Sequence, residues 1–231
     1  MLCRGAHCRG PRAIPASPGA RGGAARRAPY NRGVDSLHNV ALAAGLAWAS
    51  GIRLYAVLFL AGALAHFGYL ALPPGLAVLS HPLVLGASGA MALAEFVADK
   101  VPAFDSVWDA VHTFIRVPAG AFLAAASLGQ ADPAWVAAAA ILGGVIASGA
   151  HLTKAGSRAL INASPEPFSN WAASTLEDVL VPVGFLAALK APLVFLAALG
   201  VFLLLALWLV PKLFRALRRV YRSLAGVASG A

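Results

Sequence analysis

Long uncharged apolar runs constrain the fold of this chain more than any other feature. One of them, LVFLAALGVFLLLALWLV, covers residues 193–210. Such a run supplies about the 20 apolar residues that a membrane-spanning helix needs. A strand of a membrane barrel would instead alternate apolar and polar residues, and this run does not alternate. The pattern therefore predicts transmembrane helices.

The composition agrees with several such helices. The chain is 60% hydrophobic and 12% charged, whereas about a quarter of the residues of a soluble domain are charged. Apolar runs interrupted by Pro, Gly and charge predict helices near residues 38–50, 52–71, 82–100, 105–129, 133–160, 168–189 and 191–221. The first is too short to span, so we interpret it as a half-helix or a kinked entry to the second. The prediction is an all-α polytopic transmembrane bundle of about six spans plus a short N-terminal half-helix.

The positive charge lies mainly at the two ends of the chain. Of the 18 Lys and Arg residues behind the net charge of +9, seven precede position 33 and five lie in PKLFRALRRVYR, 211–222. This distribution is typical of cytoplasmic flanks and gives no reason to expect a nucleic-acid partner. With an even number of spans, both termini of this multi-pass protein are expected in the cytoplasm. The predicted domains are a disordered basic tail (1–37), a transmembrane domain (38–211) and a basic cytoplasmic tail (212–231).

The N-terminal tail has a composition of its own. It is rich in Arg, Gly, Pro and Ala and lacks the apolar core of a signal peptide. We expect the natural start to lie near Val34. Cys3 and Cys8 are the only cysteines, so the membrane part has no disulfide and no Cys-based metal site.

Two segments share a pattern that predicts an internal repeat. PAFDSVW (102–108) resembles PEPFSNW (165–171), and ASGA occurs at 87–90 and at 147–150. The pattern of each segment predicts a helix, a polar loop and a second helix, and two spans separate the copies. The repeat would therefore be parallel.

Seven of the nine acidic residues fall in residues 95–116 and 151–178. In the first segment Asp105, Asp109, His112 and Arg116 follow helical spacing and share one helix face. The candidate polar site comprises these four residues and Arg53, Glu95, Asp99, Lys100, Lys154, Arg158, Asn162, Glu166, Ser169, Asn170, Glu177 and Asp178.

Two readings of these charges stay open at this point. In the first, they are solvated residues of cytoplasmic loops, with Trp108 and Trp171 as interfacial anchors. In the second, Glu95 and Asp99 face Lys154 and Arg158 inside the bundle, because an unpaired charge at membrane depth costs about 2.5–3.5 kcal/mol. Arg53 in GIRLY (51–55) favours the second reading, since a lone arginine before an apolar helix needs an acidic partner or an anion unless it snorkels.

Several blocks resemble one known family of bacterial membrane proteins. They are GIRLY, EFVADKVPAFDSVWDAVHTFIR (95–116), KAGSRALINASPEPFSNW (154–171) and LEDVLV (176–181). Together they resemble the domain of unknown function 4126 over about residues 36–210. The resemblance implies an integral membrane protein of the bacterial inner membrane and no established activity.

The leading functional hypothesis is a transporter, channel or flippase-like protein for a small or anionic solute or a lipid head group. A membrane-embedded enzyme acting on a phosphate-bearing lipid is the alternative, and a scaffold without a substrate is the third. The enzyme reading has little support, because the chain lacks a Walker loop, G-x-G-x-x-G and G-x-S-x-G. Asp109 and His112, with Glu95 or Asp99, form only a weak metal signal, so we predict no metal and no cofactor. The expected partners are the lipid bilayer and a small anionic ligand or lipid head group.

Overall fold

A computed structural model describes residues 32–129, 131–163 and 168–229. The predicted tail with Cys3 and Cys8, and also Glu166, lies outside the described residues. The chain divides into two compact units, Met1–Arg32 and Gly33–Ala231. Everything that follows concerns the second unit.

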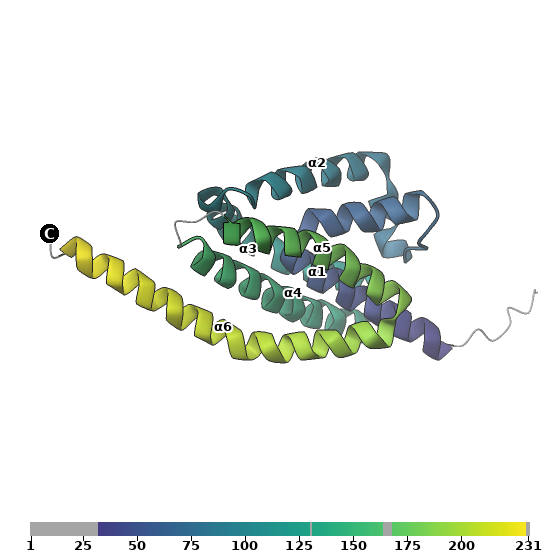
Figure 1. The fold of residues 1–231 in the computed structure, drawn as a ribbon. Coiled ribbons are helices and arrows are strands. Elements are labelled where there is room, and N and C mark those ends of the chain that lie inside the picture. The colour runs from purple at the N-terminus through teal and green to yellow at the C-terminus, as the bar shows by residue number, and fades with distance from the viewer. Residues whose placement is uncertain (1–31, 130, 164–167, 230–231) are drawn as a thin grey trace, which may run out of the picture. The chain divides into compact units, whose positions relative to one another are not determined.

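The described residues form helices and no strand, which confirms the all-α membrane-bundle class (Figure 1). The helices are α1 (Arg32–His66), the 3-10 helix η1 (Pro74–Ser80), α2 (Pro82–Ala98), α3 (Pro102–Ser127), α4 (Pro133–Ile161), α5 (Phe168–Lys190) and α6 (Pro192–Ser229). Five are long and apolar enough to cross a membrane, and η1 with α2 forms a sixth candidate bent by 71°.

Prolines define where most of these helices begin. Proline occupies one of the first positions of η1, α2, α3 and α4, where its missing N–H costs nothing because that group has no helical partner. In α4 the preceding Asp132 also accepts a hydrogen bond from the Ala134 N–H at 2.8 Å. The starts of α2, α3 and α4 therefore match the predicted ranges closely, whereas η1 was not predicted.

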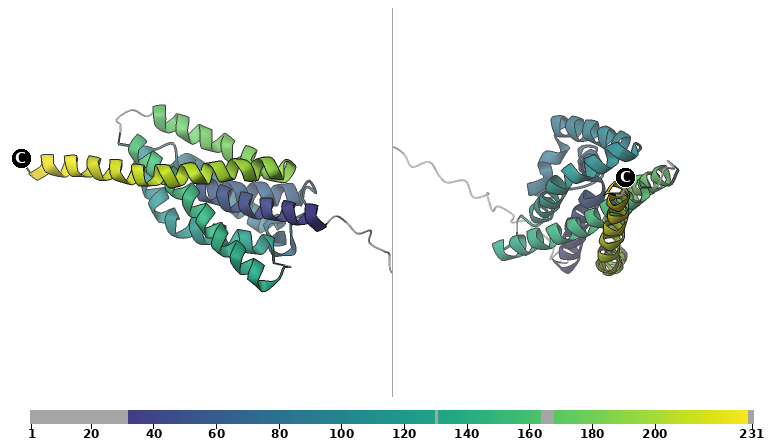
Figure 2. Two further views of the ribbon diagram at one scale, coloured as in Figure 1. Left: turned by 90° about the horizontal axis from the view of Figure 1, so that it is seen from below. Right: turned by 90° about the vertical axis from the view of Figure 1, so that its left-hand side faces the viewer.

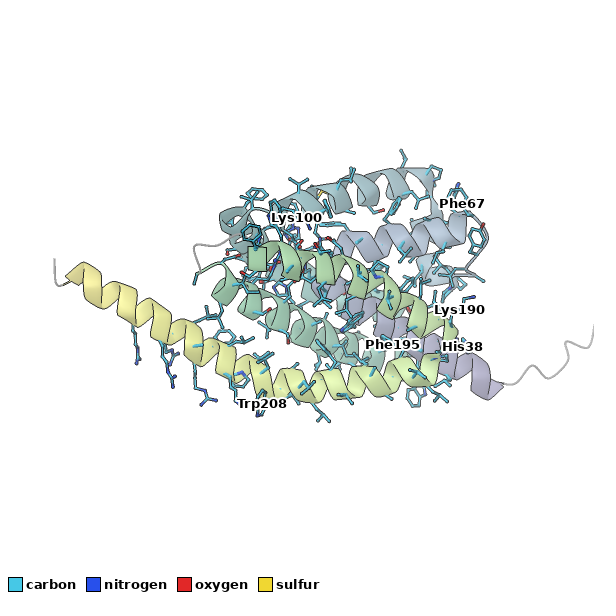
Figure 3. The ribbon with its side chains drawn as sticks, viewed as in Figure 1. His38, Phe67, Lys100, Lys190, Phe195 and Trp208 are labelled. Atoms are coloured by element: carbon cyan, nitrogen blue, oxygen red, sulfur yellow. The ribbon has the colours of Figure 1, made fainter. Side chains whose placement is uncertain are left out.

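Helix α1 is broken at Arg53, whose backbone is non-helical (φ −141°, ψ 81°). A straight helix would separate residues 39 and 66 by about 40 Å, and the next five residues can span at most about 18 Å. Nevertheless Asn39 lines the same surface pocket as residues 71–74. The chain therefore reverses direction at Arg53, and α1 is a helical hairpin. Figure 3 shows His38 and Phe67, which lie near its two ends, on the side opposite Lys100.

The first half of this hairpin occupies the centre of the bundle. Its side chains from Ala41 to Ala49 are buried on every face, as expected for a helix that is apolar all round. Small residues permit the close packing: a Cβ on Gly51 would collide with the carbonyl oxygen of Ala147 and lie 2.7 Å from the Ala150 Cβ. Such contacts between small residues are typical of helix association in membranes.

The hairpin determines which helix ends meet. Its tip lies where α2 and α4 end and where α3 and α5 begin, as the ion pairs described below show. Its open end lies near the α5–α6 junction, because a Cβ on Gly45 would contact Ala188 and Phe195. The start of α1 and the end of α6 consequently lie at opposite ends of the bundle, and α6 runs on past the end of α4 (Figures 1 and 2).

Candidate functional site

A network of buried charges surrounds the hairpin tip. Its ion pairs join six acidic and five basic side chains of the described residues: Glu95, Asp99, Asp105, Asp109, Glu177 and Asp178 with Arg53, Lys100, Arg116, Lys154 and Arg158. We call this set the charge network. It follows α3 from Asp105 to Arg116, a length of about 16 Å. In Figure 3 nitrogen and oxygen atoms gather around this end, near Lys100.

Arg53 connects the hairpin to the acids of two other segments. Its Nη2 lies 3.1 Å from Asp99 Oδ2 and 2.9 Å from Asp178 Oδ1. The same nitrogen donates to the backbone oxygen and the hydroxyl of Ser174, both at 3.1 Å. Of the two requirements that the sequence allowed for Arg53, an acidic partner or an anion, the structure therefore shows the acidic partners.

Lys154 of α4 lies against the broken backbone of α1. Its Nζ donates to the carbonyl oxygen of Ile52 at 3.2 Å and to Asp99 Oδ2 at 2.8 Å. Glu177 Oε2 is 3.3 Å away. The break at Arg53 interrupts the regular hydrogen bonding of α1, and the lysine uses a carbonyl group at that position.

Asp99 pairs with three cations of the network, Arg53, Lys154 and Arg158. It follows α2, outside the spanning helices, and its side chain is fully buried. Burial raises the pKa of this carboxyl, but the charges of Lys154 and Arg53 outweigh burial and hold the pKa below its ordinary value. Asp99 is therefore ionised in the folded protein at neutral pH.

Arg158 links the two polar loops. Its guanidinium donates to the backbone oxygen of Asp99 at 2.8 Å and to the backbone and side-chain oxygens of Asn170 at 2.6 and 2.7 Å. Asp105 Oδ1 lies 3.3 Å from the same group. Asn162 Nδ2 donates to the other Asp105 oxygen at 2.7 Å. These contacts hold the end of α4 against the starts of α3 and α5.

The deepest part of the network is the pair of Arg116 and Glu95. The two side chains have no exposed surface, and their atoms are 2.7 Å apart. Arg116 also contacts Asp109 Oδ1 at 2.8 Å. Arg116 lies near the middle of the 26-residue α3. Its position along the helix is therefore about 16 Å from the C-terminal end of α3.

Two histidines border the network. His112 Nδ1 lies 2.8 Å from the Trp108 carbonyl oxygen and donates to it, and its Nε2 lies 3.3 Å from the Tyr55 hydroxyl. Thr113 donates to the Asp109 backbone oxygen, so it accepts from Nε2 of His151 at 2.7 Å, and Nδ1 of His151 faces Arg116 at 3.4 Å. The six acids of the network exceed its five Lys and Arg residues by one.

The predicted pairing between the two segments is present with one change. Asp99 faces both Lys154 and Arg158, at 2.8 and 3.9 Å. Glu95 instead pairs with Arg116, at 2.7 Å. The predicted face of α3 is buried along its length at Asp105, Asp109, His112 and Arg116.

The other candidates lie at the edge of the network. Lys100 and Asp178 are partly exposed and 3.1 Å apart. Asn170 is buried, whereas Ser169 is half-buried and, among the described residues, makes no side-chain hydrogen bond. Sequence reasoning missed Ser174 and left His151 out of the site. His151 had a signal, since it precedes Lys154 by one turn on the same face.

Asp99, Asp105 and Asp109 each offer a carboxylate oxygen within 4.8 Å of the others. The metal hypothesis from Asp109 and His112 is not supported in that form, because His112 faces Tyr55. Lys154 lies 2.8 Å from Asp99 and 3.7 Å from Asp109. Cationic side chains thus compensate these acids, and we interpret the set as part of the charge network.

The profile of one protein family, the Domain of unknown function (DUF4126), matches residues 40–212. The chain belongs to this family. Every described residue of the charge network lies inside the matched region, so the network is a feature of the DUF4126 domain of this chain. No curated protein and no solved structure matches the sequence. The family resemblance inferred from the polar blocks is confirmed, and the function has to be argued from the site.

Proposed function

We propose that the protein transports a solute with an anionic group across the membrane, and that the charge network is its substrate site. The observation that carries the proposal is the position of Arg53. This residue is buried at the tip of a broken helical hairpin, between the acids of α5 and of the α2–α3 connection. Discontinuous helices that meet charged groups at membrane depth are characteristic of transporter binding sites.

Stability alone is a poor reason for such a network. Buried ion pairs can often be replaced by apolar residues without loss of stability. Three buried guanidinium nitrogens of the network, Arg53 Nε, Arg116 Nε and Arg158 Nε, make no hydrogen bond within the described part of the chain. Donors left without partners cost free energy, and an anionic group can accept from them. A site that exchanges its internal partners for a substrate explains this cost.

The orientation of the helices belongs to the same proposal. The positive-inside rule assigns the basic stretch of α6 to the cytoplasm, and the charge network then lies at the cytoplasmic end of the bundle. Because α1 reverses at Arg53, the start of α1 lies on the outer side. This proposed orientation differs from the expectation that both termini are cytoplasmic, which stays a prediction because residues 1–31 lie outside the described part of the chain.

Labelling of single cysteines tests the orientation. In a Cys3→Ser, Cys8→Ser background, we expect His38→Cys and Tyr69→Cys to react with an impermeant maleimide from outside the cell. Arg222→Cys should react only after the membrane is opened. Labelling of His38→Cys and Arg222→Cys from the same side would contradict the hairpin orientation.

Flux measurements test the transport proposal. The protein, reconstituted in sealed vesicles, should move at least one of a panel of small phosphates, carboxylates and labelled anionic phospholipids. Arg53→Lys keeps the charge but replaces the guanidinium, whose Nη2 contacts Asp99, Asp178 and Ser174, by an ammonium group of different geometry. Flux should therefore fall about tenfold or more, since each 1.4 kcal/mol lost is a factor of ten. Lys212→Gln, outside the network, is the matched control and should retain flux.

Two outcomes would overturn the proposal. Turnover of a phosphate-bearing lipid in detergent, with no flux in vesicles, would show a membrane enzyme. Flux that is unchanged in Arg53→Lys, with the variant folded by size-exclusion chromatography, would remove the charge network from the transport path.

A further inference from the structure

An apolar groove leads from the bundle surface to the charge network. It lies between the second half of α1, α2 and α5 and has a volume of about 380 Å³. Phe59 contributes one wall, and Gly89, Leu93 and Phe96 contribute the other. The residues at its polar end are Arg53 and Asp178. The groove thus combines apolar walls with one end that belongs to the network.

The polar end presents a carboxylate held between two cations. Asp178 Oδ1 lies 2.9 Å from Arg53 Nη2, and Asp178 Oδ2 lies 3.1 Å from Lys100 Nζ. Asp178 and Lys100 are each about a quarter exposed, so the charge network reaches the molecular surface here. The Nζ of Lys100 also lies 4.2 Å from the centre of the Phe96 ring, beside the apolar wall.

We infer that this groove binds an amphiphile with an anionic phosphate head group and an apolar chain, namely an anionic membrane phospholipid. The inference rests on the proposed function, because it names the substrate class of the same site. Two phosphate oxygens can take the places of the two Asp178 oxygens between Arg53 and Lys100, a geometry that favours charge-assisted hydrogen bonds. The chain then lies between Phe59 and Leu93.

Lipid contact by itself would not justify the inference, since exposed apolar side chains are expected on any membrane helix. What distinguishes this groove is the buried Arg53 at its end. The Asp178 carboxylate already pairs with this arginine. Asp178 competes with an anionic head group for the same two cations. The lipid therefore has to displace Asp178, and removal of that carboxylate should favour binding.

Native mass spectrometry and thermal unfolding of the detergent-purified chain, titrated with phosphatidylglycerol or phosphatidylcholine, test the inference. The wild type should retain bound phosphatidylglycerol in the mass spectrum, and this lipid should raise its unfolding midpoint. Asp178→Asn should bind phosphatidylglycerol about tenfold more tightly, because a competing charge is removed. Its affinity for phosphatidylcholine should change little.

The walls of the groove provide a matched pair of variants. A Cβ on Gly89 would lie 3.2 Å from the Phe59 ring, whereas a Cβ on Gly86, one turn earlier in α2, has no neighbour within 4 Å. Gly89→Leu should reduce phosphatidylglycerol binding at least tenfold, and Gly86→Leu should leave it unchanged. Gly89→Ala provides a milder block if the larger side chain prevents folding.

Three results would overturn the inference: equal effects of Asp178→Asn on the two lipids, equal effects of Gly89→Leu and Gly86→Leu, or equally tight binding of glycerol phosphate. The last result would identify a soluble anion as the ligand. Because binding is measured without flux, the two proposals can fail separately. Binding without flux would contradict transport alone, and flux without lipid binding would contradict the groove alone.

Discussion

Replacing Arg116 by Met should destabilise the protein by about 3–5 kcal/mol, the usual cost of removing one partner of a buried ion pair. Arg116 and Glu95 have no exposed surface and are 2.7 Å apart. Without the guanidinium, Glu95 loses its ion-pair partner in an apolar surrounding, and Asp109 keeps only Lys154, at 3.7 Å. Thermal unfolding in detergent, followed by tryptophan fluorescence, should show a large decrease in the midpoint.

A double-mutant cycle identifies the partner of Glu95. Adding Glu95→Gln to Arg116→Met should recover part of the loss, because it removes the charge that lost its partner. The control cycle combines Glu95→Gln with Lys212→Gln, which lies outside the charge network, and should be close to additive. Additive effects in the Glu95–Arg116 cycle would contradict the pairing.

This pair illustrates what helical periodicity can and cannot predict. The spacing from Asp105 to Arg116 correctly places four polar residues on one face of α3, and that face is buried. Periodicity does not determine how far α2 is shifted along α3 and α4. Glu95 therefore reaches Arg116, within its own predicted copy of the repeat, and not Lys154 in the other copy.

The hairpin of α1 shows a second limit. The break near Ser50-Gly51 was visible in the sequence, and the structure places the non-helical residue at Arg53. Composition is the same for a straight helix and a reversed helix, so it does not reveal the reversal. The packing of Gly51 against Ala147 and Ala150 determines it, and those contacts join residues almost 100 positions apart in the sequence.

The partners of Arg53 could be predicted from the sequence only in part. The cost of an unpaired charge in a membrane required an acidic partner or an anion. The acids that meet this requirement, Asp99 and Asp178, come from different segments, and only the fold brings them to the same nitrogen atom. The type of partner was predictable from physical chemistry, whereas its identity depended on tertiary structure.

Asp99→Asn should also destabilise the protein by about 3–5 kcal/mol at neutral pH. The carboxylate lies 2.8 Å from Lys154 and 3.1 Å from Arg53. An amide in its place removes the closest acid of Lys154, whose next acidic neighbour, Glu177, lies 3.3 Å away. Asp132→Asn is the control, because Asp132 is exposed and asparagine caps a helix about as well as aspartate. This control should change the unfolding midpoint very little.

Acidification should reduce the difference between the wild type and Asp99→Asn. Lys154 and Arg53 outweigh the effect of burial and lower the pKa of Asp99 in the folded protein. A carboxyl with a lowered folded pKa stabilises the protein fully above its unfolded pKa, and this contribution is lost as the pH falls through the folded pKa. The wild type should therefore lose stability in acid more steeply than the variant. Parallel pH profiles of the two proteins would show that the ionised Asp99 does not stabilise the network.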